Sequence, residues 1–220
     1  VGAVVGAGEG KARNVGVLWA PGVGPVQQYT KRHPVPFAEY IPFRSVVRSI
    51  TEKADLVRAD FVAGGRAGVF ESSAPGGVVR FGDVICFEVA YDSLVRDTVT
   101  GGAQLLVTQT NNATFNPAEA AQQLAMVRLR SVEHGRAGLM ASTVGISAFT
   151  TPDGRAHQST AFDSQAVVTG QVYLKTSQTP ATRLGGTPEM ILTGLALFGL
   201  LAAVALRRRA GVPPTDEEEA

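Results

Sequence analysis

Residues 81–91 have the sequence FGDVICFEVAY, and they contain Cys86, the only cysteine among the 220 residues. The β-branched pair Val84 and Ile85, just before the thiol, predicts a strand that leads to it. Glu88 follows two positions later and adds a carboxyl group. A thiol placed in this way is a candidate nucleophile. The alternative is that Cys86 is a small buried hydrophobic residue, as free cysteines often are.

A second segment, residues 29–40, has the sequence YTKRHPVPFAEY. A thiol attacks only as the thiolate, so it needs a base or a nearby cation. Lys31 can be that cation, and it can also stabilise the oxyanion that forms when Cys86 attacks a carbonyl. The backbone N–H of Phe87 is a natural second donor. His33 lies two residues from Lys31, on the same face of a strand, so we expect it to support the site rather than act as the base.

Composition argues against several classes of partner and cofactor. The formal net charge is +1, which gives no indication of a nucleic-acid partner. One cysteine forms no internal disulfide, so the fold must depend on its core. The three histidines lack the spacing of metal ligands, and the chain has no phosphate-binding or nucleotide-binding motif. We therefore expect no metal, no cofactor and no nucleic acid.

Short apolar runs indicate an α/β fold. Such runs recur at 15–19, 84–87, 105–108, 139–142, 146–149 and 166–174. Several are too short for helices and rich in Val, Ile and Phe, which predicts strands. Asn116 and Pro117 predict the start of a helix, and Gly135 predicts its end. An Asp-Gly pair within 151–155 predicts a turn between antiparallel strands. Residues 51–77 are polar and rich in glycine, which predicts a loop outside the core.

Residues 190–206 contain no charged side chain. They are close to the minimum of about 17 residues for a membrane-spanning helix. Three arginines, 207–209, follow at once, which favours a spanning helix over the alternative of a buried core helix. By the positive-inside rule the arginines lie in the cytoplasm and the preceding domain lies outside the cytoplasmic membrane. The Pro-rich acidic end, 213–219, is typical of a solvated, disordered tail.

Segments 29–40 and 81–91 together resemble the Lys and Cys segments of the nitrilase (carbon–nitrogen hydrolase) superfamily. With the apolar segment near the C-terminus, the chain most resembles the apolipoprotein N-acyltransferase family within it. The resemblance implies an α/β fold of the αββα sandwich type, incomplete at its N-terminus and followed by one transmembrane helix. The expected boundaries are 1–182 for the catalytic domain, 188–206 for the helix and 207–220 for the cytoplasmic tail.

The resemblance also implies roles for site residues. It makes Cys86 the nucleophile and Lys31 the cation, with Glu39 and Glu88 as supporting carboxylates. Without the resemblance, Glu39 would be interpreted as half of a surface salt bridge. The corresponding interpretation of Glu88 is a structural ion pair with an arginine, for which Arg96 and Arg128 are the candidates.

Asn111 and Asn112 begin a segment, NNATF, that resembles the family's NNAWF segment beside the active site, which implies that both lie near the site. Thr114 replaces the family's Trp, so contacts of that Trp are not transferred. Two asparagines after a strand also fit a simple turn. The family's general base is a glutamate upstream of the lysine, and Glu9 does not match its motif. We expect the chain to start too late to contain this base, and to be inactive alone.

The implied reaction is acyl transfer in two steps. Cys86 takes an acyl group from a phospholipid as a thioester, and the N-terminal diacylglyceryl-cysteine of an apolipoprotein then accepts it. The expected partners are thus a phospholipid, an apolipoprotein and the cytoplasmic membrane, which the full protein crosses several times. One alternative is a hydrolase of the same superfamily that acts on a small amide or nitrile. Another is a non-catalytic, membrane-tethered fragment.

Overall fold

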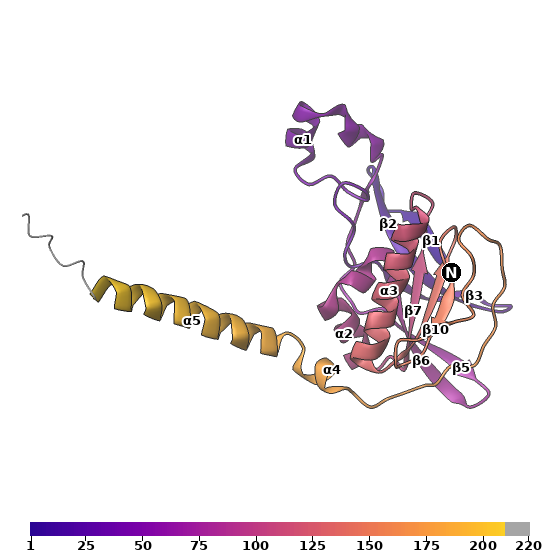
Figure 1. Cartoon of the computed structure of the whole chain (residues 1–220). Coiled ribbons are helices and arrows are strands. Elements are labelled where there is room, and N and C mark those ends of the chain that lie inside the picture. Colours follow the sequence, from indigo (N-terminus) through magenta and orange to yellow (C-terminus); the bar gives the residue numbers. More distant parts are fainter. Residues whose placement is uncertain (210–220) are drawn as a thin grey trace, which may run out of the picture. The chain divides into compact units, whose positions relative to one another are not determined.

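The structure is a computed structural model, and it describes residues 1–209. The chain forms two compact units, which divide between Arg183 and Leu184. The first unit is a mixed α/β domain, and the second contains one long helix, α5 (Figure 1). Most of the predicted tail, 207–220, lies outside the described residues.

The smaller sheet of the first unit has four strands. Three form an antiparallel meander in the order β1-β2-β3, and β4 pairs in parallel with the start of β2. The strands are β1 (Gly2–Gly6), β2 (Lys11–Ala20), β3 (Gly24–Thr30) and β4 (Asp60–Phe61). Because β3 ends at Thr30, Lys31 directly follows a strand.

The larger sheet has six strands in the order β10-β9-β8-β7-β6-β5. Strands β6, β7 and β8 are parallel, and β5, β9 and β10 pair in antiparallel fashion at the edges. The strands are β5 (Val69–Ala74), β6 (Gly77–Ile85), β7 (Leu105–Thr110), β8 (Ala137–Ser142), β9 (Ala148–Thr150) and β10 (Ala156–His157). The connections between the parallel strands contain α2 (Asp92–Thr100) and α3 (Pro117–His134), as parallel pairing requires.

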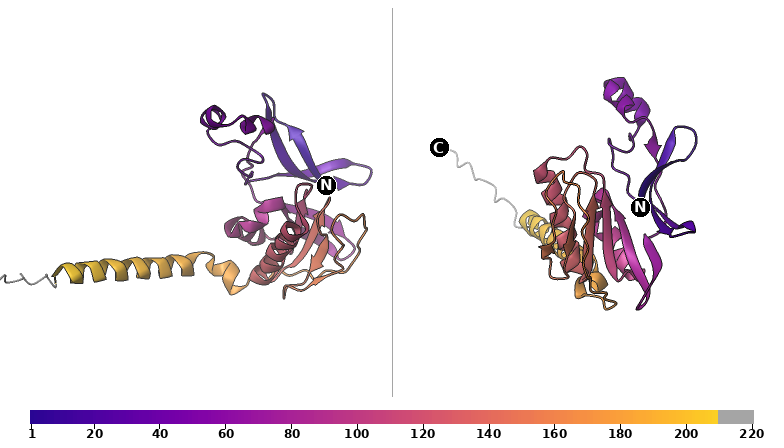
Figure 2. Two further views of the ribbon diagram at one scale, coloured as in Figure 1. Left: turned by 45° about the horizontal axis from the view of Figure 1, so that its top comes forward. Right: turned by 90° about the vertical axis from the view of Figure 1, so that its right-hand side faces the viewer.

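Helices α2 and α3 cover one face of the six-stranded sheet, and the four-stranded sheet covers the other (Figure 2). Val84 and Leu94 belong to the apolar cluster between the helices and the sheet. A smaller cluster of Tyr29, Phe70 and Ile85 joins the two sheets. Burial of one such aliphatic side chain stabilises the fold by about 1.5–3 kcal/mol. The described residues thus form helix, sheet and sheet layers of the expected αββα sandwich.

Several local predictions are confirmed. Runs 15–19, 105–108 and 139–142 lie in β2, β7 and β8. The turn within 151–155 joins the antiparallel strands β9 and β10. The three runs and the turn therefore have the structure that their residues predict.

Other predictions are wrong. In run 84–87 the strand ends at Ile85, and the next residues begin the 3-10 helix η2 (Cys86–Ala90). In run 146–149 only the last two residues belong to a strand. Run 166–174 forms no strand, and most of its side chains are exposed, so its apolar residues contribute no buried face. Segment 51–77 is not all loop, since it contains β5 and its hairpin turn to β6.

Helix α3 begins and ends where its capping residues predict. The Asn116 side chain accepts a hydrogen bond from the Glu119 N–H at 3.0 Å, and the Glu119 carboxylate accepts one from the Asn116 N–H at 2.8 Å. This reciprocal capping box satisfies donors that a helix start leaves free. Gly135 ends the helix in the left-handed conformation, φ 59°, which glycine adopts without strain.

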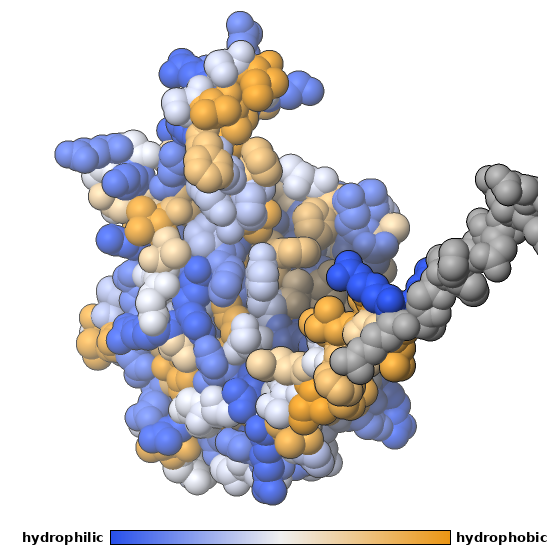
Figure 3. All heavy atoms as spheres, turned by 90° about the vertical axis from the view of Figure 1, so that its left-hand side faces the viewer, coloured by the Kyte–Doolittle hydropathy of each residue, from blue (hydrophilic) through white to orange (hydrophobic). Residues whose placement is uncertain are grey.

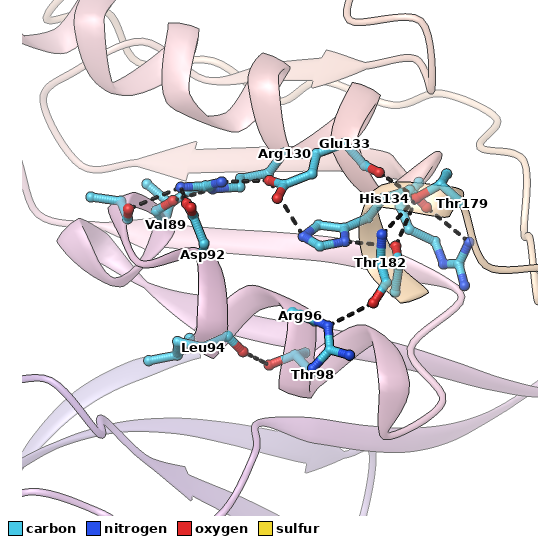
Figure 4. A network of polar contacts seen from close by, with 12 residues as sticks. Val89, Asp92, Leu94, Arg96, Thr98, Arg130, Glu133, His134, Thr179 and Thr182 are labelled. Atoms are coloured by element: carbon cyan, nitrogen blue, oxygen red, sulfur yellow. Dashed lines mark hydrogen bonds and ion pairs between the residues drawn. The ribbon is translucent and has the colours of Figure 1, made fainter. Parts of the chain in front are cut away.

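A polar network fixes α3 to its neighbours (Figure 4). Arg130 donates from Nε to the carbonyl of Val89 and from Nη2 to that of Ala90, both at 2.9 Å, so it holds the end of η2. His134 is fully buried, and its Nδ1 lies 2.9 Å from Thr182 Oγ1. Burial lowers the pKa of His134. The network therefore attaches both η2 and the segment after residue 175 to one helix.

Residues 42–57 project from the domain (Figure 1) and contain α1 (Arg44–Ile50) and the 3-10 helix η1 (Glu52–Leu56). An ion pair between Arg44 and Asp60, with an N–O distance of 2.6 Å, holds the segment to β4. Apolar side chains gather on it (Figure 3), and the exposed ones are Phe43, Val46, Ile50 and Leu56.

Helix α5 (Thr187–Arg209) has 23 residues, a length of roughly 34 Å. An 18-residue window of this helix has a mean hydropathy of 2.1, and none of that window is buried. A bilayer core is about 30 Å thick. By length and composition, α5 can therefore cross a membrane, and its exposed side chains argue against the alternative of a buried core helix.

Asp83 is a buried carboxyl group between the two sheets. It lies on β6, and its oxygens accept hydrogen bonds from Gln109 Nε2 at 2.7 and 2.9 Å. Gly16 of β2 faces it so closely that a Cβ there would lie 1.7 Å from Asp83 Oδ2. Burial raises the pKa of Asp83 to about 7; the Gln109 hydrogen bond opposes this rise and the charge of Glu88 adds to it.

We predict that Asp83→Asn removes a pH dependence of stability. In the unfolded chain this carboxyl is ionised above about pH 4, whereas in the fold it keeps its proton up to about pH 7. Ionisation thus favours the unfolded state as the pH rises. The contribution of Asp83 to the free energy of unfolding falls by about 1 kcal/mol per pH unit, on average, between pH 5 and pH 7.

Urea denaturation in detergent at pH 5 and pH 7 measures this effect. The wild type and the exposed control Asp163→Asn should lose stability equally, and Asp83→Asn should lose about 2 kcal/mol less. The same pH dependence in all three proteins would contradict the prediction.

Candidate active site

Cys86 lies at a sharp turn between β6 and η2. The strand ends at Ile85, and Cys86 begins η2 with a left-handed backbone, φ 55°. A side chain in this conformation costs about 1–2 kcal/mol, so the surrounding contacts must hold it. The turn takes Cys86 out of the strand and brings its partly exposed side chain to a cavity of about 890 Å³.

The cavity lies between the two sheets. Apolar side chains from both sheets make up much of its wall, among them Val17, Leu18, Trp19, Phe61, Phe70, Phe81, Ile85 and Val107. Cys86 shares the cavity with the polar residues Glu39, Asp83 and Asn111. The space is thus mostly apolar, with a thiol and two carboxyl groups at its wall.

Glu88 is fully buried, and its carboxylate ties the Cys segment to the Lys segment. Its Oε1 accepts hydrogen bonds from the backbone N–H groups of Arg32 at 2.6 Å and His33 at 3.1 Å. Its Oε2 accepts one from the N–H of Ile85 at 2.9 Å. The Tyr29 hydroxyl, 2.9 Å from Oε1, donates to the same carboxylate. One carboxylate therefore joins residues that lie more than 50 positions apart.

Glu88 forms these hydrogen bonds and does not form the ion pair with an arginine that was the alternative prediction for it. Arg96 and Arg128 do not pair with it, because each donates to a backbone carbonyl elsewhere. Burial and the neighbouring Glu88 carboxylate raise the pKa of Tyr29. The phenol consequently keeps its proton and remains a donor.

Lys31 is 1% exposed, and its Nζ lies 2.7 Å from Glu39 Oε2. The same oxygen accepts a hydrogen bond from the Val35 N–H at 2.7 Å, and Glu39 Oε1 accepts one from Asn14 Nδ2 at 3.1 Å. Glu39 therefore pairs with a buried cation at the cavity wall and is not half of a surface salt bridge. Asn14, on β2, completes this arrangement, and no sequence motif had indicated it.

His33 and Phe87 pack against one aromatic ring. The His33 imidazole stacks on Tyr91 with centroids 4.4 Å apart, and Phe87 meets the edge of Tyr91 at 6.2 Å. No hydrogen bond joins His33 to Cys86 among the described residues. This packing fits the supporting role expected of His33. The role of the Phe87 N–H as an oxyanion donor stays a prediction.

Asn111 and Asn112 take different positions. Asn111 lines the cavity, and its Oδ1 accepts hydrogen bonds from Thr143 Oγ1 at 2.8 Å and the Ala113 N–H at 3.2 Å. The second bond closes a local turn, as two asparagines after a strand predict. Asn112 is fully buried behind the cavity wall. It lies in a group with Gln123, which sequence reasoning missed because a glutamine on the buried face of a helix has no motif.

The structure brings Cys86, Glu39 and Asn111 to one cavity and links Lys31 to it through Glu39. Glu9 lies outside it, exposed in the turn between β1 and β2. Within residues 1–209, no three His, Cys, Asp or Glu side chains gather as metal ligands would. The arrangement offers a nucleophile, a paired cation and a mostly apolar space.

Comparisons with solved structures give the fold. An amidase from Nesterenkonia sp. superposes with a TM-score of 0.53 at 19% identity, covering 73% of this chain and 56% of that one. A cysteine-to-serine mutant of the same amidase, described as a member of the nitrilase superfamily, gives a TM-score of 0.56 at 17% identity, covering 88% and 66%. At this level of identity the likeness concerns the fold alone.

Sequence comparisons are more specific. An apolipoprotein N-acyltransferase of Mycolicibacterium smegmatis is 39% identical over 88% of this chain and 32% of its own length. One of Gloeobacter violaceus is 34% identical over 84% of this chain and 35% of its own length. The chain thus spans about a third of the length of these relatives. The carbon-nitrogen hydrolase family model matches residues 1–181, and the chain therefore belongs to the carbon-nitrogen hydrolase family, with the nitrilase-superfamily fold.

Proposed function

We propose that this chain is the catalytic part of an apolipoprotein N-acyltransferase, with Cys86 as the nucleophile. The observation that supports this most directly is that Cys86 and Glu39 line one cavity, with Lys31 paired to Glu39. The names of the relatives in Mycolicibacterium smegmatis and Gloeobacter violaceus support the choice of reaction.

In the first half-reaction the Cys86 thiolate attacks the ester carbonyl of a phospholipid. A sulfur–carbon bond forms, the ester carbon–oxygen bond breaks, and the acyl group stays on Cys86 as a thioester. The thiol proton passes through a general base to the departing lysophospholipid oxygen. Lys31 and the Phe87 N–H stabilise the oxyanion between these events. We assign no residue of this chain as the general base.

In the second half-reaction the α-amine of a diacylglyceryl-cysteine, at the N-terminus of an apolipoprotein, attacks the thioester. A carbon–nitrogen bond forms, the carbon–sulfur bond breaks, and the amine proton returns through the base to the thiol. A thioester is more easily aminolysed than the oxygen ester from which the acyl group came. Glu39 holds Lys31 in place, and Glu88 holds the two segments together.

Helix α5 explains how this site would reach lipid substrates. Its length and hydropathy suit a bilayer, and arginines follow its apolar stretch. The positive-inside rule then places the arginines in the cytoplasm and the catalytic domain outside the cytoplasmic membrane. In this proposal the complete protein crosses the membrane several times.

An amidohydrolase that acts on a small amide or nitrile is the second candidate. The fold likeness to the Nesterenkonia amidase favours it, and such an enzyme would use the same Cys86 and Lys31. A soluble substrate gives no role to α5, and the N-acyltransferase relatives are more similar in sequence. A non-catalytic fragment is the third candidate, and the absence of an assigned base favours it for this chain alone.

Trapping of the acyl-enzyme tests the proposal. Membranes containing the complete gene product are incubated with phospholipid labelled in its acyl chains. We expect label on the protein that hydroxylamine removes, because hydroxylamine cleaves thioesters. Cys86→Ser should show no hydroxylamine-sensitive label, since an oxygen ester resists the same treatment.

The same preparation separates the candidates. Label that persists unchanged in Cys86→Ser would contradict the role of Cys86. Turnover of a small amide without any acyl label would favour the amidohydrolase. The chain of residues 1–220, tested in parallel, should stay unlabelled if the base is absent from it.

We predict that Glu39→Gln slows thioester formation by about 100-fold. Lys31 is almost fully buried, and without the carboxylate it loses the partner that orients it toward the oxyanion. Single-turnover acylation of the complete gene product measures this rate. Glu71→Gln is the control, because it breaks only an exposed ion pair with Arg80; rates that fall equally in both variants would contradict the role of Glu39.

We predict that Glu88→Gln destabilises the fold by about 3 kcal/mol. Both carboxylate oxygens accept backbone N–H groups, so an amide nitrogen on either side would face a donor. Tyr29→Phe removes only one hydrogen bond and should cost about 1 kcal/mol. Urea denaturation compares the two variants, and an equal cost would show that the backbone contacts of Glu88 contribute little.

A further inference from the structure

A group of buried polar side chains lies next to Cys86, on the side of helix α3. Gln123 of α3 is 2% exposed, and its Nε2 lies 3.7 Å from Cys86 Sγ. Its Oε1 lies 3.2 Å from Oγ1 of Thr110, the last residue of β7. Asn112 follows, fully buried, with its Oδ1 2.5 Å from the same hydroxyl. These side chains form a continuous line of contacts that ends on the thiol.

The number of available hydrogen atoms decides which of these side chains donates each hydrogen bond and which accepts it. The Thr110 hydroxyl has one proton, so it can donate to only one of the two amides, and the other amide must donate to it. When Asn112 Oδ1 faces the Thr110 hydroxyl, Asn112 Nδ2 is buried without a partner in the described part of the chain. Rotation of the Asn112 amide by half a turn, which leaves its shape unchanged, directs that nitrogen to Thr110. The atom left over is then a carbonyl oxygen, which proteins leave unpaired more readily than an N–H.

With Asn112 donating to Thr110, the hydroxyl donates to Gln123 Oε1, and Gln123 Nε2 is directed to the sulfur. The opposite direction would turn Gln123 around and place its carbonyl oxygen beside Cys86. An amide N–H favours the thiolate, because a hydrogen bond to the charged form stabilises that form. A carbonyl oxygen in the same place favours the protonated thiol. The direction of the line therefore decides which form of Cys86 the protein stabilises.

We propose that Gln123 is a positioning residue that donates a hydrogen bond to the Cys86 thiolate, and that Thr110 and Asn112 fix the direction of that bond. The inference rests on the proposed nucleophilic role of Cys86. It adds a contact on the α3 side of the thiol, from a residue that is not among those lining the cavity, whereas Thr110 does line it. Gln123 takes no part in bond making.

Alkylation tests this proposal, because Cys86 is the only cysteine and iodoacetamide therefore reports on one site. The rate is measured from pH 5 to pH 10 on the intact chain in detergent. In Gln123→Leu we expect the midpoint of the pH–rate curve to rise by about one unit, with about tenfold slower alkylation below the midpoint. Gln122→Leu, at the exposed neighbouring position, should match the wild type.

Two further variants test which side chain donates each hydrogen bond between Asn112, Thr110 and Gln123. Thr110→Val removes the hydroxyl that fixes the Gln123 amide, and we expect a smaller shift in the same direction. Asn112→Asp supplies a group that only accepts, so Thr110 must donate to the new carboxylate and Gln123 must turn. This variant should therefore shift the midpoint nearly as far as Gln123→Leu, although it lies two contacts away from the sulfur.

A wild-type midpoint in Gln123→Leu, with a cooperative thermal transition retained, would overturn the proposal. If Gln123→Leu does not fold, wild-type midpoints in both Thr110→Val and Asn112→Asp would overturn it instead. Alkylation needs no phospholipid, so the result is independent of the acyl-transfer assay. A shifted midpoint without acyl label would contradict the proposed function and support the role of Gln123.

Discussion

One buried carboxylate, that of Glu88, holds the candidate site together. It accepts hydrogen bonds from Ile85, beside the thiol, and from Arg32 and His33, beside Lys31. A buried carboxylate without its donors would be costly, and three backbone N–H groups would likewise be left unpaired without it. Each segment therefore needs the other. This constraint explains how two stretches far apart in the chain maintain a fixed geometry.

The same constraint accounts for the turn at Cys86. The Ile85 N–H is directed to Glu88 Oε2, so the chain must curl into η2 rather than continue as a strand, and Cys86 takes the left-handed conformation. Arg130 holds the other end of η2 through two carbonyls. The strained backbone conformation of Cys86 is thus maintained by contacts on two sides, from the Lys segment and from α3.

Local signals in the sequence predicted what local interactions determine. The capping residues Asn116 and Gly135 set the ends of α3, because a helix cap involves only residues within one turn. The strand predicted at 84–87 ended early because its last residues respond to Glu88, whose partners lie in another segment. The motifs indicated Cys86, Lys31 and Glu39, but no pattern marks a buried Gln123, since its contacts arise only when α3 packs on η2.

The two carboxyl groups of the cavity differ in charge, and this difference suits a thiolate. Glu39 is paired with the buried Lys31 cation, so its negative charge is compensated. No cationic side chain within residues 1–209 lies within hydrogen-bond reach of Asp83, and burial raises its pKa to about 7. Below that pH it is neutral and adds no charge to oppose the thiolate. Above it, a second anion would form in the same cavity, and like charges in a low-dielectric space disfavour each other.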